Sequence, residues 1–248
     1  MLPSRMNSTP RGMIMKRKIS EAVLSVVLAV VATALWTAPV EAVNTGAPRI
    51  APPVSHAFGK TYPEWFSTYW RWFYGTAQNP AQGVVGHVQL MPQPVGTQVG
   101  GTWTPIDPAV YVGALSINLR PGTPFVLPLL GLVGERYEGY PTVPDDDPAF
   151  YANATYSAKL TIDGKTIVSP ANQAAFFLPV TFFDPIVEYP GGPTSYGSVA
   201  AIWFEGIGIV SPPLPVGVHV IHLDATLIVP SVFGVTYDNT WTVTVTPH

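Results

Sequence analysis

Apolar and polar positions follow two different periods along the chain. Between residues 61 and 75 the spacing is that of a helix, with aromatic side chains over a little more than half of the circumference. Thr61 and Glu64 form the S/T-x-x-E capping box at the start, and Pro63 lies in the first turn, where it removes no hydrogen bond. Gly75 marks the end. The pattern predicts an amphipathic helix with an aromatic face.

Beyond the helix the period changes to two, which is the spacing of strands that bury one face. In the last segment, Trp241, Val243 and Val245 alternate with threonines. Asp163-Gly164, between two such segments, is a two-residue hairpin signal. The candidate strands are Val84–Leu90, Val110–Leu119, Pro124–Val133, Thr155–Ile162, Lys165–Val168, Ala174–Phe183, Val199–Val210, Val218–Val229 and Thr240–Thr246.

Many short strands without intervening helices predict a mainly β fold. The expected architecture is an antiparallel β-sandwich or jelly roll that carries one N-terminal amphipathic helix. Pro128 and Pro179 interrupt two of the candidate strands, which predicts edge strands or bulges at those places.

The beginning of the chain has the three-part layout of a secretory signal peptide. Lys16-Arg17-Lys18 precedes fifteen uncharged residues, Ala22 to Trp36, and then comes Val40-Glu41-Ala42. Fifteen is short of the roughly 20 apolar residues that a spanning helix needs, so we expect cleavage after Ala42 and no stable membrane anchor. The protein is therefore expected to be secreted, either outside the cell or into a periplasm.

With this signal peptide, we expect the chain to consist of a leader, a lead-in and one domain. Residues 1–42 form the signal peptide, for which Met13 and Met15 are alternative starts. Residues 43–59 are a Pro-rich, extended lead-in, and residues 60–248 form a single β-sandwich domain with no internal boundary.

Few charges remain after removal of the leader. The whole chain has 12 basic and 15 acidic residues, and the leader contains five and two of them. The remaining chain therefore has seven basic and 13 acidic residues, a net charge of −6. An acidic balance argues against nucleic acid as a partner. A weakly charged surface also suits a subunit of an oligomer. The absence of cysteine excludes disulfides and thiolate metal sites, and no motif calls for a metal or another cofactor.

Six segments form a recognisable set: Lys60-Thr61-Tyr62-Pro63-Glu64-Trp65, Trp70-Arg71-Trp72, Pro121 to Pro128, Leu160 to Lys165, Glu205-Gly206 and Pro213 to His219. Together they resemble a family of exported bacterial proteins with a K-T-Y-x-E-W…W-x-W opening. They span most of the chain after the leader. The resemblance implies one secreted β domain with an N-terminal helix, and it implies no activity.

A histidine and two carboxylates are the candidate catalytic residues. In a strand, His222 and Asp224 share one face, while His219 lies on the other face with apolar neighbours. A carboxylate can orient an imidazole as a general base. Glu205 lies in an apolar segment and is either a general acid or the partner of an arginine, for example Arg71, Arg120 or Arg136. The alternative for the histidines is a satisfied core residue at His219 and a solvated one at His222.

The aromatic helix supplies the candidate ligand-binding residues. Aromatic faces stack on the apolar faces of sugars, but an aromatic stripe also serves to plug a β-sandwich. Trp65, Tyr69 and Phe73 suit the plugging face. The candidates for ligand contact are Trp72 and Tyr74, at the margins of that face, with Arg71 and Arg120.

Two hypotheses follow. The first is a binding or structural module for a glycan or a small apolar ligand. The second is a secreted hydrolase or lyase that uses His222, Asp224 and Glu205, which requires the three side chains to converge.

Overall fold

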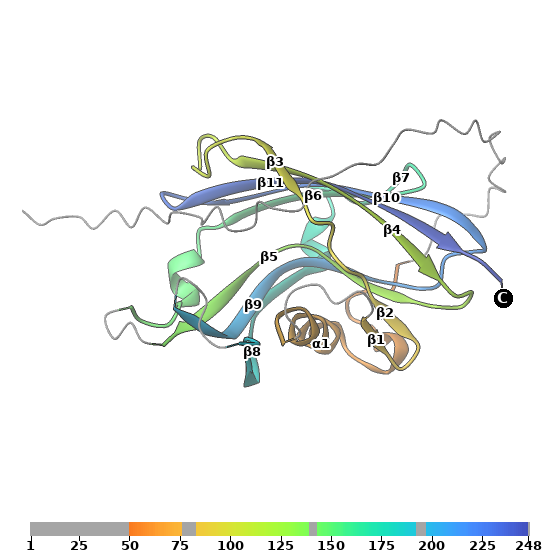
Figure 1. Ribbon diagram of the computed structural model, residues 1–248, viewed down its shortest axis with the longest axis horizontal. Helices are drawn as coiled ribbons and strands as arrows, with labels where there is room; N and C mark the ends of the chain where they lie inside the picture. The colour runs from red at the N-terminus through yellow and green to blue at the C-terminus, as the bar shows by residue number, and fades with distance from the viewer. Residues whose placement is uncertain (1–49, 76–82, 139–142, 192–196, 248) are drawn as a thin grey trace, which may run out of the picture. The chain divides into compact units, whose positions relative to one another are not determined.

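Two β-sheets and one long helix make up the described part of the chain (Figure 1). The computed structural model describes residues 50–75, 83–138, 143–191 and 197–247. The expected signal peptide and residues 43–49 of the lead-in lie outside these ranges.

The first sheet has five strands. In spatial order they are β1 (Gly83–Val85), β2 (Val88–Leu90), β5 (Phe125–Tyr137), β9 (Ser198–Ser211) and β8 (Phe177–Glu188). The second sheet has six, in the order β3 (Thr97–Gly100), β4 (Ala109–Leu119), β11 (Phe233–Val245), β10 (Gly217–Val229), β6 (Thr155–Ile162) and β7 (Lys165–Val168). The helix is α1 (Tyr62–Gly75), and the short 3-10 helices are η2 (Ala57–Gly59), η3 (Pro148–Tyr151) and η4 (Gln173–Phe176).

The mainly β, sandwich-like fold with one N-terminal helix is confirmed, but the sheets are mixed. Most neighbouring strands are antiparallel, as expected, whereas β4 runs parallel to β11 and β2 runs parallel to β5. Parallel pairing joins strands that are distant in sequence, and alternation within one strand carries no information about the direction of its neighbour.

Four strand predictions need correction. The segment Val84–Leu90 is a hairpin of β1 and β2, because Gly86 adopts a φ of 64° and turns the chain. The strand predicted at Ala174–Phe183 runs from Phe177 to Glu188, because Gln173–Phe176 forms η4. The last strand begins at Phe233 and not at Thr240. Strand β3 was not expected, since all four of its residues are exposed and it has no buried face.

The two proline predictions are confirmed. Pro128 lies at a register shift between β5 and β9, and Pro179 lies at a register shift in β8, which is the edge strand of its sheet. A bulge or an edge tolerates a residue without an amide proton.

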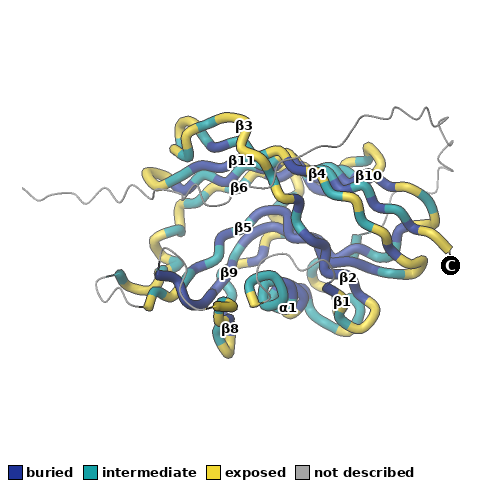
Figure 2. The backbone as a smooth tube through the Cα atoms, viewed as in Figure 1, coloured by how far each residue is buried: buried dark blue, intermediate teal, exposed yellow. Residues whose placement is uncertain are grey.

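One core lies between the two sheets. Its largest members include Trp203 of β9 and Trp241 of β11, both fully buried. The indole nitrogen of Trp241 donates to the carbonyl of Pro92, in the segment that crosses from β2 to β3. Figure 2 shows β5 and β9 buried along most of their length, while β3 is exposed.

A second core lies between the helix and the outer face of the five-stranded sheet. Trp65, Phe66 and Tyr69 of α1 are buried there, against Phe204 of β9 among others. The hydroxyl of Tyr69 donates to the carbonyl of Met91 at 2.9 Å. The helix therefore does not plug the space between the sheets. It adds a third layer, and it leaves the outer face of the six-stranded sheet without a helix among the described residues.

Local contacts explain the start of the helix. The carboxylate of Glu64 accepts hydrogen bonds from the backbone amide of Thr61 at 2.6 Å and from its hydroxyl at 2.8 Å. These bonds lower the pKa of Glu64. The predicted capping box is thus present, and it determines where the helix begins.

Candidate functional site

The two faces of β10 are as the alternation predicts. His222 and Asp224 lie on the outer face of the six-stranded sheet, and His219 points into the sandwich. His222 Nε2 lies 2.8 Å from Asp238 Oδ1 on β11. Asp224 stands opposite Lys159 on one neighbouring strand and Asp238 on the other. The partner of His222 is therefore Asp238 and not Asp224.

His219 has the role of a satisfied core residue. Its Nδ1 lies 2.7 Å from Asp163 Oδ2, in the hairpin turn between β6 and β7, and its Nε2 lies 2.9 Å from the carbonyl oxygen of Pro215. Each ring nitrogen therefore has an oxygen within hydrogen-bonding distance. This imidazole ties the start of β10 to the Asp163-Gly164 turn.

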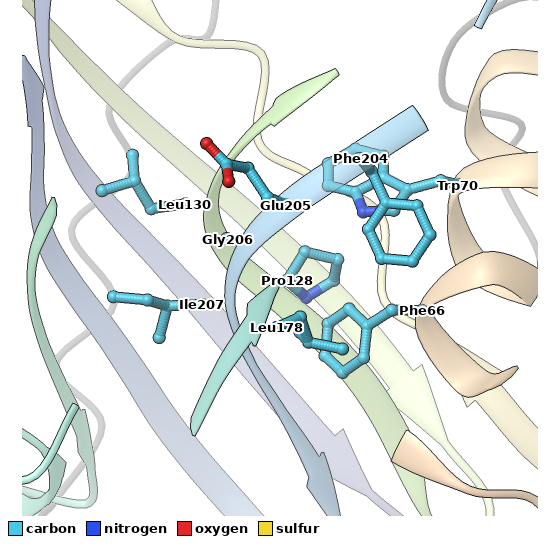
Figure 3. Close-up of a pocket in the computed structure, with 9 residues that line it drawn as sticks. All are labelled: Phe66, Trp70, Pro128, Leu130, Leu178, Phe204, Glu205, Gly206 and Ile207. Carbon is cyan, nitrogen blue, oxygen red and sulfur yellow. The ribbon is translucent and has the colours of Figure 1, made fainter. Parts of the chain in front are cut away.

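Glu205 lies in the other sheet and faces the space between the sheets. Figure 3 shows Glu205 and Ile207 on one side of β9 and Phe204, with Phe66 and Trp70 of the helix, on the other. The space among these side chains is too narrow for a water molecule. Since His222 and Asp224 are on the outer face of the opposite sheet, the structure does not bring the three candidate catalytic residues together.

The partner of Glu205 is a tyrosine and not an arginine. The hydroxyl of Tyr156 on β6 donates to Glu205 Oε1 at 2.7 Å. The arginines that the sequence offered lie elsewhere. Arg71 lies over the ring of Phe183 at 5.3 Å, Arg136 pairs with Asp145 at 3.1 Å, and Arg120 is exposed at the end of β4.

Trp72 and Tyr74 are engaged in packing. The ring of Trp72 lies over Gly83, where an added Cβ would stand only 2.4 Å from it. Tyr74 stacks on Trp70 and lies 5.6 Å from the ring of Tyr189. With Arg71 over Phe183 and Arg120 in a turn beyond β4, the four candidate ligand-binding residues do not form one open platform.

A pocket of about 280 Å³ is lined in part by Tyr156, the hydrogen-bond partner of Glu205. Its lining comes from β6, η4, β8 and β9, and consists of Tyr156, Gln173, Ala174, Phe177 and Ile207. The rings of Tyr156 and Phe177 meet edge to face at 5.3 Å and form an aromatic wall. Ile207 also belongs to the tight space in Figure 3, which Glu205 lines as well.

The side chain of Gln173 holds η4 against β6. Its amide oxygen accepts from the backbone nitrogen of Ala158 at 2.8 Å, and its amide nitrogen donates to the carbonyl of Tyr156 at 2.7 Å. The amide is occupied by these two bonds and fixes one wall of the pocket.

A close approach of two strands places Glu205 and Ile207. Gly206 has a φ of 149°, and a Cβ at this position would lie 2.2 Å from the carbonyl oxygen of Leu130. On the facing strand, a Cβ at Gly131 would lie 2.6 Å from the carbonyl oxygen of Glu205. Only glycine fits at either place, and the register between β5 and β9 depends on both.

Burial controls the protonation of the tyrosine. Desolvation first, and then the hydrogen bond to Glu205, raise the pKa of Tyr156 well above its ordinary value. The hydroxyl therefore keeps its proton across the physiological range and serves as a donor to the carboxylate.

Most of this pocket has no signature in the sequence. Tyr156 and Glu205 are 49 residues apart, and neither alternation nor motif links them. Only Glu205 was a candidate, because a carboxylate in an apolar strand is unusual.

No helix in the described ranges is long and apolar enough to cross a membrane. The same ranges contain no group of three histidine or carboxylate side chains placed to hold a metal ion.

The sequence matches no family model and no curated protein. Among solved structures, the chain is similar to a cysteine protease inhibitor from Entamoeba histolytica, at 13% identity and a TM-score of 0.22, over 55% of this chain and 96% of that one. A similarity of this size carries no conclusion about activity. The resemblance of the aromatic opening to exported bacterial proteins stays a prediction.

Proposed function

We propose that the protein is an exported binding module for a small, largely apolar ligand, which it takes into the pocket lined by Tyr156 and Phe177. The observation that carries this proposal is the pocket itself, a hollow of about 280 Å³ with an aromatic wall and Ile207 behind it. Ligand sites in proteins are typically concave and mostly apolar, with a few fixed polar groups, and this hollow is at the small end of their range.

The lining favours a small apolar ligand over a glycan. A sugar needs several free polar partners for its hydroxyl groups, whereas the amide of Gln173 is occupied by the backbone of β6. The remaining lining residues are Tyr156, Phe177, Ala174 and Ile207, which offer mainly apolar surface. A molecule with one ring and one polar group fits both the size and the lining.

No enzymatic function is proposed. A hydrolase or lyase that uses His222, Asp224 and Glu205 requires all three to reach one substrate or a bridging water. His222 and Asp224 lie on the outer face of the six-stranded sheet, and Glu205 faces the space between the two sheets.

The test is a binding screen with a variant that fills the pocket. Ala174 and Ala175 are neighbouring, exposed residues of η4, and only Ala174 lines the pocket. Ala174→Trp should occupy the hollow, and Ala175→Trp is the matched control. The screen uses single-ring alcohols, amines and carboxylates and a set of mono- and disaccharides, with calorimetry and ligand-observed nuclear magnetic resonance as readouts.

We expect single-ring apolar molecules to bind the wild type and the Ala175→Trp control, and Ala174→Trp to lose at least about tenfold in affinity. Binding of saccharides alone would replace the proposed ligand class with a glycan. Equal binding by both tryptophan variants, or no binding by any member, would refute the proposed site.

A further inference from the structure

We infer that the ligand of this pocket is a cation, a small apolar amine whose ammonium group pairs with Glu205. The inference rests on the proposed function and specifies its ligand class. Its starting point is the carboxylate of Glu205, which is bonded to the pocket residue Tyr156 and is two residues before the pocket residue Ile207 on β9. Its partner is a neutral hydroxyl and not a positive charge.

The surroundings of Glu205 are apolar. Leu130 and Ile207 lie next to it on the inner side of the five-stranded sheet, and Figure 3 shows all three on the same side of β9. Its side chain is half-buried, so part of the carboxylate is removed from water. Removing a carboxylate from water costs free energy unless a counter-charge or several hydrogen bonds compensate.

The described residues supply one hydrogen bond and no counter-charge. The Tyr156 hydroxyl donates to Oε1, and no lysine, arginine or histidine of the described ranges forms an ion pair with Glu205. After the expected leader, the residues outside the described ranges include two that can carry a positive charge, Arg49 and His248, and none within 76–82, 139–142 and 192–196. A neutral hydroxyl stabilises a carboxylate by a single hydrogen bond, which leaves Oε2 for another donor.

The lysines and arginines of the described ranges have other positions. Arg120 directly follows β4, and Lys165 is the first residue of β7. Arg71 lies over Phe183 and Arg136 pairs with Asp145. Lys60 lies over the ring of Trp65 at 5.6 Å. Lys159 lies opposite Asp224 on the outer face of the six-stranded sheet.

The aromatic wall suits the same class of ligand. Tyr156 and Phe177 line the pocket, and aromatic rings attract cations that lie near their faces. The protein without its leader has a net charge of −6, which favours the approach of a cation over that of an anion. An ammonium group bound to Glu205 would keep its apolar substituent against Tyr156, Phe177 and Ile207.

The test compares ligands that are equal in shape and differ in charge. The probes are cyclohexylamine and cyclohexanol, and benzylamine, benzyl alcohol and benzoate, titrated by calorimetry into the purified protein. Glu205→Gln removes the charge and keeps an acceptor for Tyr156. Glu188→Gln, at an exposed position of β8, is the control for the loss of one negative charge. Thermal denaturation of both variants checks that they are folded.

We expect each amine to bind the wild type at least about tenfold more tightly than its alcohol, and benzoate to bind weakest. Glu205→Gln should abolish the preference for the amine, and Glu188→Gln should keep it. Added salt should weaken the amine more than the alcohol.

The remaining outcomes separate this inference from the proposed function. If the alcohols bind as well as the amines and Ala174→Trp abolishes both, the pocket binds ligands but the cation inference is wrong. An amine preference that survives in Glu205→Gln also overturns it. If none of the probes binds, both the inference and the proposed function fail for single-ring ligands.

Discussion

The hydroxyl of Tyr156 donates to Glu205 Oε1 at 2.7 Å, and this contact joins the two sheets at the edge of the sandwich. Tyr156 belongs to β6 of the six-stranded sheet, and Glu205 belongs to β9 of the five-stranded sheet. The bond has two consequences. It fixes one wall of the proposed ligand pocket, and it contributes to the stability of the sandwich.

Tyr156→Phe should lower the free energy of unfolding by about 1.5–3 kcal/mol, because a hydrogen bond to a charged group is lost and the carboxylate keeps its place between the sheets. Chemical denaturation measures the change. The control is Tyr111→Phe, whose hydroxyl bonds to Gln98 at 3.2 Å on an exposed part of the sheet, and for which we expect about 1 kcal/mol or less. If both variants lose the same free energy of unfolding, the hydrogen bond between the sheets stabilises the fold no more than the exposed one does.

Gly206→Ala should destabilise the protein by about 3–5 kcal/mol or prevent folding. The new Cβ would lie 2.2 Å from the carbonyl oxygen of Leu130, and the φ of 149° is unfavourable for any residue with a side chain. Gly122→Ala is the control, with a φ of 79° and nothing within 4 Å of its Cβ, and should cost about 1–2 kcal/mol. Circular dichroism during thermal unfolding compares the two. A small effect at Gly206 would mean that β5 and β9 are not in close contact there.

His219→Phe should cost about 1–3 kcal/mol, because the imidazole contacts to Asp163 and to the carbonyl of Pro215 are lost inside the sandwich. His222→Phe, on the outer face, should change stability by about 0.5 kcal/mol or less. Denaturant titrations of the two variants measure the difference. The opposite order would contradict the assignment of the two faces of β10.

Alkaline pH should destabilise the fold. Burial raises the pKa of Tyr237 from 10.0 to about 12, and it also raises the pKa values of Tyr62, Tyr69 and Tyr189. A raised pKa means that the folded state holds the proton more tightly than the unfolded chain. The stabilisation is therefore complete below pH 10 and is lost as the pH rises from 10 towards 12.

From Tyr237 alone we expect a loss of about 2 kcal/mol by pH 12, and Tyr237→Phe should make the decline shallower. Denaturation at a series of pH values measures stability, and ultraviolet absorbance follows the ionisation of the tyrosines. A free energy of unfolding that stays constant between pH 10 and 12 would contradict burial of these rings.

Several features could be predicted from the sequence because they depend on neighbours in the chain. The capping box at Thr61 and Glu64 uses residues three apart. The hairpin turn at Asp163-Gly164 has positive φ at both residues, 51° and 73°, as a two-residue turn between strands requires. The faces of β10 follow from strict alternation, which placed His219 inside and His222 outside.

The candidate site was predictable only in part. Glu205 was a candidate from the sequence because burying a carboxylate among apolar neighbours costs free energy unless it is paired. Its partner, Tyr156, could not be identified, since many tyrosines and three arginines were available and the choice depends on which strands face each other.

Short-range patterns therefore determined the two faces of β10, the turn at Asp163-Gly164 and the start of the helix, since each of these is decided within a few residues. The tertiary structure alone decided that β4 runs parallel to β11, that α1 covers the outer face of one sheet, and that Tyr156 meets Glu205 beside a pocket. Those outcomes depend on contacts between segments far apart in sequence. The favoured arrangement of strands and helix is the one that buries the most apolar area in total, and no local sequence pattern specifies that total.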